Sequence, residues 1–118
     1  MEYRRSVLIV EDEGIIALDL RNLFERAGYR VIGVASDAEH ALLLAASDPP
    51  AVAIIDVKLA TAIDGITLAI ELDARYKARV VFVTGNPQIV VNEARHLTNG
   101  IFSKPYQNDD LLRAVADA

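Results

Sequence analysis

The chain has no cysteine, which excludes a disulfide framework, a thiolate metal site and a cysteine nucleophile. Long hydrophobic runs are also missing: stretches such as ALLLAA, at 41–46, are far shorter than a membrane span. The start, MEYRRSVLIV, has too short an apolar core for a signal peptide and instead indicates a first strand. We therefore expect a cytoplasmic protein that does not insert into a membrane.

Positive charge is scarce as well. Twelve basic residues against 17 acidic ones give a net charge of −5. Nucleic-acid-binding modules usually carry a basic face, so direct binding of nucleic acid is disfavoured. With 118 residues, 53% of them hydrophobic and 25% charged, the composition is typical of one globular domain with a real core.

Apolar, β-branched runs alternate five times with stretches of helical period. The expected strands cover 6–10, 29–35, 51–57, 79–85 and 100–105, and the expected helices cover 13–28, 36–47, 65–77, 87–97 and 108–118. This alternation predicts an α/β fold, a single (βα)5 doubly wound parallel sheet with the flavodoxin-like strand order 2-1-3-4-5. We expect one domain over residues 1–118 and no output domain in this chain.

Local signals support two of the helices. The first carries one apolar face, made by Ile16, Leu20, Leu23, Phe24 and Ala27. The second is preceded by SDAE, in which Ser36 and Glu39 match a capping box.

Polar side chains lie at the carboxyl ends of four of the predicted strands. Glu11 and Asp12 follow the first strand, and Asp56, Thr84 and Lys104 lie in the last two residues of the third, fourth and fifth strands. Because ligands bind beyond the carboxyl ends of parallel strands, near the change in strand order, we expect these side chains to meet at one edge.

Three carboxylates at one edge repel one another unless a cation lies among them. Mg²⁺ suits such a site, since it prefers carboxylates, carbonyls, waters and phosphate oxygens. The formal charges then balance, because Glu11, Asp12 and Asp56 supply −3 while Mg²⁺ and Lys104 supply +3. A nucleophile, a metal, a cation and a neutral hydroxyl suit the stabilisation of a phosphoryl group on a carboxylate.

The motifs VLIVEDE, IIDV, VFVTG and FSKP each end the appropriate strand. In this ordered set, over essentially the whole chain, the sequence resembles a response-regulator receiver domain of two-component signalling. The stretch VFVTGNP further resembles the atypical subgroup whose fourth strand is Phe-Ala-Thr-Gly, many of whose members are stand-alone receivers.

The resemblance implies that Asp56 accepts a phosphoryl group from a histidine kinase or a histidine phosphotransfer protein. It also implies that the Thr84 hydroxyl moves onto one phosphoryl oxygen and that Lys104 pairs with another. Such a protein is a switch that binds a downstream partner. It is not a classical enzyme, because it catalyses only its own phosphorylation and dephosphorylation. We expect a monomer or weak dimer.

For the metal, the resemblance implies a Mg²⁺ site made by Glu11, Asp12, Asp56 and the backbone carbonyl of Lys58. Asp12 is the more direct ligand of the first two. The Lys58 side chain has two open interpretations, contact with the phosphoryl group or with solvent only.

Besides the VFVTGNP stretch, the sequence departs from the usual pattern of the family in two further places. An aromatic residue usually lies three residues before the strand-5 lysine, but here that position is Ile101, and Phe102 should point to the opposite face. The segment after Asp56 has no Met-Pro and reaches Gly65 one residue later than usual. By resemblance the output surface is helix 4, strand 5 and helix 5, with helix 1 as the alternative.

Three other functions are weighed against the switch. A degenerate receiver would act as a phosphorylation-independent binding module, which the complete residue set argues against. A haloacid-dehalogenase-type phosphatase needs a second acid where Lys58 stands, and flavodoxin needs a phosphate loop where EDEG, at 11–14, would repel phosphate. His40 and His96 are expected to be surface or half-buried residues rather than ligands, and Glu13 is expected to be only a helix-terminal acid.

Overall fold

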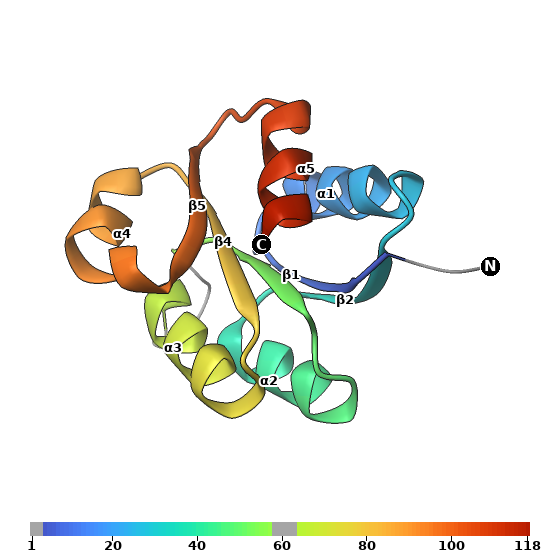
Figure 1. The fold of residues 1–118 in the computed structure, drawn as a ribbon, viewed down its shortest axis with the longest axis horizontal. Helices are drawn as coiled ribbons and strands as arrows, with labels where there is room; N and C mark the ends of the chain where they lie inside the picture. The colour runs from blue at the N-terminus through green and yellow to red at the C-terminus, as the bar shows by residue number, and fades with distance from the viewer. Residues whose placement is uncertain (1–3, 58–63) are drawn as a thin grey trace.

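The computed structural model describes residues 4–57 and 64–118, and strands alternate with helices along them. The strands are β1 (Ser6–Val10), β2 (Arg30–Ala35), β3 (Val52–Ile55), β4 (Arg79–Thr84) and β5 (Thr98–Ser103). The helices are α1 (Gly14–Arg26), α2 (Ala38–Ser47), α3 (Gly65–Tyr76), α4 (Pro87–Glu93) and α5 (Asn108–Asp117), with a short 3₁₀ turn at Arg95–Leu97 (Figure 1).

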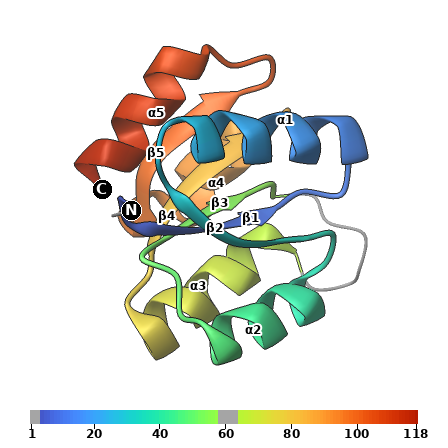
Figure 2. The same ribbon diagram turned by 90° about the vertical axis from the view of Figure 1, so that its right-hand side faces the viewer.

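The five strands form one parallel sheet in the order β2-β1-β3-β4-β5, which confirms the predicted topology. Helices α1 and α5 cover one face of the sheet, while α2 and α3 cover the other (Figure 2). Helix α4 packs against β4 and β5 and shares the core of the α2–α3 side. The carboxyl ends of β1, β3 and β4 therefore lie side by side.

The core has two layers because successive strand side chains point to opposite faces of the sheet. In β1, Val7 and Ile9 belong to the layer under α1 and α5, while Leu8 and Val10 belong to the layer under α2 and α3. Every residue of β3 is buried, as expected for a parallel strand covered on both faces.

The predicted apolar face of α1 is confirmed. Leu20 and Phe24 are buried, and Ile16, Leu23 and Ala27 pack against the same layer. The Phe24 ring meets the Tyr29 ring edge to face, with centroids 5.5 Å apart. These contacts hold α1 over β1 and so fix where the chain leaves β1.

The predicted capping box at the start of α2 is wrong. The N-cap is Asp37, whose carboxylate accepts a hydrogen bond of 2.8 Å from the His40 backbone N–H. Because β2 ends at Ala35 and α2 begins at Ala38, Ser36 lies one position too early to cap the helix. Asp is as good an N-cap residue as Ser, so the sequence does carry a capping residue, one position after the predicted Ser36.

Predicted and observed ends agree within two residues except at the end of α4, which was predicted to reach Leu97 and ends at Glu93. The chain then turns so that β5 can begin at Thr98, which pairs with Val80. The Thr98 hydroxyl donates to the carbonyl oxygens of Val80 and Gly100, at 3.3 and 2.6 Å. Helical periodicity could not show this early start, because it depends on pairing with β4.

Ile101 and Phe102 point to opposite faces of the sheet, as predicted. Ile101 packs on the α2–α3 side and Phe102 packs under α1 and α5. At the other end of the sheet, the Arg5 guanidinium donates hydrogen bonds to the carbonyl oxygens of Val115 and Ala118, at the end of α5.

Leu72 and Leu43 offer a matched test of this layering, since both are helical leucines on the same side of the sheet. Leu72 is fully buried, whereas Leu43 is 70% exposed. We expect Leu72→Ala to lower the free energy of unfolding by about 2–5 kcal/mol through cavity formation. Leu43→Ala should change it by less than about 0.5 kcal/mol. Urea denaturation measures both, and equal losses would contradict this packing.

Candidate functional site

The backbone of the sheet brings the predicted site residues to one edge. The Asp56 N–H donates to the carbonyl of Val10, the last residue of β1, at 2.9 Å, so Asp56 and Glu11 leave neighbouring strands at the same level. The Lys104 N–H donates to the Thr84 carbonyl at 3.0 Å, which places β5 in register with β4. The structure brings Glu11, Asp12, Asp56 and Lys104 together, as strand order predicts, while the Thr84 side chain contacts Asn86 instead.

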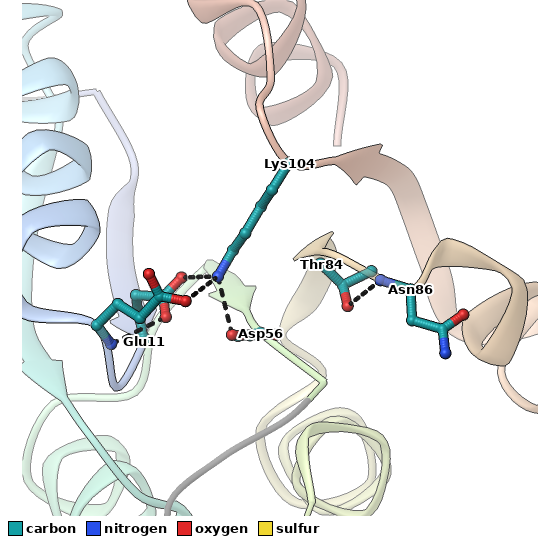
Figure 3. Close-up of polar contacts among 6 residues, drawn as sticks. Glu11, Asp56, Thr84, Asn86 and Lys104 are labelled. Atoms are coloured by element: carbon teal, nitrogen blue, oxygen red, sulfur yellow. Dashed lines mark hydrogen bonds and ion pairs between the residues drawn. The ribbon is translucent and has the colours of Figure 1, made fainter.

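Lys104 occupies the centre of this edge, with its side chain reaching across from β5 (Figure 3). Its Nζ lies 2.8 Å from Glu11 Oε1, 3.0 Å from Asp56 Oδ2 and 3.7 Å from Glu13 Oε1. The exposed fractions are 2% for Glu11 and 6% for Asp56, so both carboxylates are held almost entirely away from water. The Lys104 ammonium therefore forms ion pairs with two buried carboxylates.

Burial and the neighbouring charges shift the pKa values of Glu11 and Lys104 in opposite directions. Burial raises the pKa of the Glu11 carboxyl above its usual range, although the hydrogen bond to Lys104 partly offsets that rise. Burial by itself would lower the pKa of the Lys104 ammonium, but its hydrogen bonds to Glu11 and Asp56 outweigh this and raise the pKa. Lys104 is thus firmly charged at neutral pH.

Three carboxylates at this edge are close enough to share a metal ion. Oxygens of Glu11, Asp12 and Asp56 all lie within 4.8 Å of one another, and Asp12 is exposed while the other two are buried. An all-oxygen donor set with one side open to water suits a hard cation that keeps part of its hydration shell. The predicted fourth contact, the Lys58 carbonyl, lies outside the described residues.

Thr84 is buried at the end of β4, yet its hydroxyl is engaged away from Lys104. Thr84 Oγ1 accepts a hydrogen bond of 3.1 Å from the backbone N–H of Asn86 (Figure 3). Asn86 is the N-cap residue of α4, and its own side chain makes no capping hydrogen bond. The threonine hydroxyl therefore ties the end of β4 to the start of α4.

Two residues near the site were not recognised from sequence. Glu13 was expected to be only a helix-terminal acid, but its carboxylate approaches Lys104. Asn86 was not singled out, although its position before Pro87 at the start of a helix is a usable capping signal. His40 and His96 are both exposed, and neither belongs to a metal-ligating group within residues 4–57 and 64–118.

The family model for the response regulator receiver domain matches residues 7–116. The chain belongs to this family. The match confirms the resemblance drawn from the strand-end motifs. Receiver domains are regulatory modules rather than classical enzymes, as predicted.

Two curated relatives are regulators by name. The phyllosphere-induced regulator PhyR of Methylorubrum extorquens is 31% identical, over 96% of this chain and 43% of the relative. The transcriptional regulatory protein PdtaR of Mycobacterium tuberculosis is 35% identical, over 94% of this chain and 55% of the relative. This receiver domain thus spans about half the length of either relative.

Solved structures agree on the architecture. The signal receiver domain of a modulated diguanylate cyclase from Desulfovibrio desulfuricans is 33% identical, with a TM-score of 0.88 over 97% of this chain and 92% of that one. The receiver domain of PhyR from Erythrobacter litoralis has a TM-score of 0.89 over 98% and 89% at 24% identity, which supports the fold alone. Among the described residues, none of the helices has the length and apolarity needed to cross a membrane.

Lys104→Met tests whether the ammonium is needed to hold the buried carboxylates. Without it, Glu11 and Asp56 lose their shared countercharge, and we expect the free energy of unfolding to fall by about 2–4 kcal/mol in metal-free buffer. The control is Lys77→Met, since Lys77 is exposed and has no ion pair to a described residue. Chemical denaturation of both variants measures the effect, and equal stabilities would show that Lys104 is not structurally required.

Proposed function

We propose that this receiver domain is a phosphorylation-dependent switch, which accepts a phosphoryl group on Asp56 from a histidine kinase or histidine phosphotransfer protein in the cytoplasm. The observation that supports this most directly is the placement of Asp56. Its carboxylate is nearly buried, paired with Lys104 and within reach of two further acids. Carboxylates gathered at the carboxyl ends of parallel strands, with an ammonium among them, suit a phosphoryl-accepting site that also holds a hard cation.

In this proposal an oxygen of Asp56 attacks the phosphorus of a phosphohistidine. A new P–O bond forms as the P–N bond breaks, and the electron pair of that bond stays on the imidazole nitrogen. Mg²⁺, held by Glu11, Asp12 and Asp56, would supply positive charge that offsets the negative charge developing on the phosphoryl oxygens. The carbonyl of Lys58 remains part of the proposed ligand set.

Lys104 has a defined part in this step. Its ammonium is 3.0 Å from Asp56 Oδ2, beside the place where the transferred group must arrive. Once Asp56 is an acyl phosphate, the ammonium can pair with a phosphoryl oxygen while it keeps its contact with Glu11, 2.8 Å away. The cation is thus already in place before the reaction and needs little reorganisation.

A groove provides access for the donor. It has a volume of about 800 Å³, lies between α1 and the segment from β5 to α5, and includes Lys104 and Tyr106 in its wall. On another side of α1, Leu18 is 58% exposed and lines a second groove together with Glu11 and Asp12, and Ile15 is 81% exposed. We assign the exposed surface of α1, with the grooves on both of its sides, to docking of the phosphodonor.

The response to phosphorylation is proposed to start at Thr84. In this proposal the Thr84 side chain rotates toward the phosphoryl group to donate its hydroxyl proton, and the movement of Oγ1 takes the present acceptor away from the Asn86 N–H. The start of α4 must adjust, so the signal passes to α4 and the neighbouring β5 and α5 surface. This route does not require a rotating aromatic residue, which suits Ile101 at the position where one is usual.

Incubation with Mg²⁺ and acetyl phosphate tests the phosphoacceptor. We expect the wild-type chain to gain one phosphoryl group by intact-mass spectrometry and Asp56→Asn to gain none, because the amide cannot form the acyl phosphate. Asp73→Asn, at an exposed position on α3, is the control and should react like wild type. No gain in the wild type, or an undiminished gain in Asp56→Asn, would refute the proposal.

Thr84→Ala separates phosphorylation from response. Loss of one neutral donor costs about 1 kcal/mol, so the phosphorylation rate should stay within about tenfold of wild type. The α4 amide signals in NMR spectra should then barely change on phosphorylation, whereas Thr84→Ser should retain the change. A full α4 response in Thr84→Ala would show that Thr84 is not the switch.

A further inference from the structure

Gly65, the first residue of α3, is buried directly against the strand end that carries Asp56. A Cβ atom at this position would lie 2.1 Å from the Asp56 carbonyl oxygen. It would also lie 2.8 Å from Ile55 Cγ2 and 2.8 Å from Val57 Cα. Gly65 does not have a positive φ, so glycine is needed here for close approach and not for an unusual backbone conformation.

Two hydrogen bonds hold α3 in this place. The Gly65 N–H donates to the Val57 carbonyl at 2.7 Å, which joins the helix start to the residue after Asp56. The Asp64 carboxylate accepts from the Thr67 N–H at 2.8 Å and closes the first helical turn. The backbone of Asp56 is therefore held from both sides, by β1 through Val10 and by α3 through Gly65.

We propose that Gly65 is a positioning residue for Asp56, an inference that rests on the proposed function of that carboxylate. Because Gly65 has no side chain, α3 can lie directly on the backbone of Asp56. This contact fixes how far the Asp56 carboxylate projects beyond the end of β3. In the resulting position, Asp56 Oδ2 lies 3.0 Å from Lys104 Nζ, and the carboxylate lies close to those of Glu11 and Asp12. Gly65 touches none of the reacting atoms and acts only through the Asp56 backbone.

The expected loss of phosphorylation rate in Gly65→Ala can be estimated from the steric overlap of the new Cβ with the Asp56 backbone. Ordinary contact with a Cβ begins near 3.4 Å, so an atom 2.1 Å from the Asp56 carbonyl forces helix and strand apart by roughly 1 Å. The obstructing atoms are mostly backbone and cannot rotate away. A displacement of about 1 Å at a reacting group can slow a reaction roughly a hundredfold.

Two other glycines supply matched controls. A Cβ at Gly33 would meet Leu44 Cδ1 at 2.8 Å, and a Cβ at Gly100 would meet Phe102 Cε2 at 2.8 Å. These neighbours are side-chain atoms distant from the backbone, so Gly33→Ala and Gly100→Ala strain the fold without moving Asp56. These two variants show how a glycine substitution changes stability and phosphorylation when it does not displace Asp56.

The experiment compares Gly65→Ala with these controls by three measurements on the full chain. They are the melting temperature, the rate of phosphorylation by acetyl phosphate with Mg²⁺, and the NMR signals of the Asp56 carboxyl carbon and Lys104 Nζ without metal. We expect Gly65→Ala to melt earlier than wild type, and the two control variants to change less, because the ends of the Leu44 and Phe102 side chains can move aside. Only Gly65→Ala should shift both signals and slow phosphorylation, by roughly ten- to a hundredfold. Unshifted signals and a wild-type rate in folded Gly65→Ala would overturn the proposal.

If Gly65→Ala does not fold, two milder substitutions test the same proposal. Asp64 and Asp37 each cap a helix through a 2.8 Å hydrogen bond, but only the helix capped by Asp64 bears on Asp56. Asp64→Ala and Asp37→Ala should lose similar stability, while Asp64→Ala alone shifts the Asp56 carboxyl signal and slows phosphorylation several-fold. Identical behaviour of the two variants would overturn the proposal.

The design also separates this inference from the proposed function. If the wild-type chain takes up no phosphoryl group, the proposed function fails. The metal-free NMR signals of Asp56 and Lys104 still show whether Gly65 positions the carboxylate.

Discussion

One partly buried ammonium shared by two buried carboxylates is the interaction on which the rest of this structure depends. Lys104 comes from β5, Glu11 follows β1 and Asp56 follows β3, so the contact exists only if the strands adopt their observed order. Taking these charges out of water is costly, and breaking such a group is costlier still. The apolar strands that carry them supply the rigidity that keeps the three groups at bonding distance.

The charges at this edge do not balance within the described residues, and that imbalance is informative. Lys104 offers one positive charge near Glu11, Asp56 and the more distant Glu13, while Asp12 adds a further negative charge at the surface. An arrangement chosen for stability alone would favour neutral or fully paired groups. The gathering of acids at this edge suits the chemistry proposed for Asp56, in which a metal cation would lie beside them.

Much of the fold was predictable because it depends on periodic patterns and on a general rule for parallel sheets. Five strand–helix alternations predicted the topology, and the polar residues at the strand ends predicted that Glu11, Asp12, Asp56 and Lys104 would lie together, whereas the Thr84 hydroxyl was found bound to Asn86. The N-cap at Asp37 and the early start of β5 were missed because they depend on exact chain geometry and on pairing between strands. The sequence also showed no reason for the close contact between Gly65 and Asp56, since spacing along the chain does not show which backbone atoms touch.

The hydrogen bonds from Arg5 to the last carbonyls of α5 place residue 5 beside residue 118. In this receiver domain the two ends of the described chain are therefore neighbours in space, at the edge of the sheet opposite Asp56. Covalent closure of the chain into a ring would need only a short linker and would leave the site untouched. Closure would remove conformational freedom mainly from the unfolded chain and would thereby stabilise the folded domain. It would place no new constraint on the residues around Asp56.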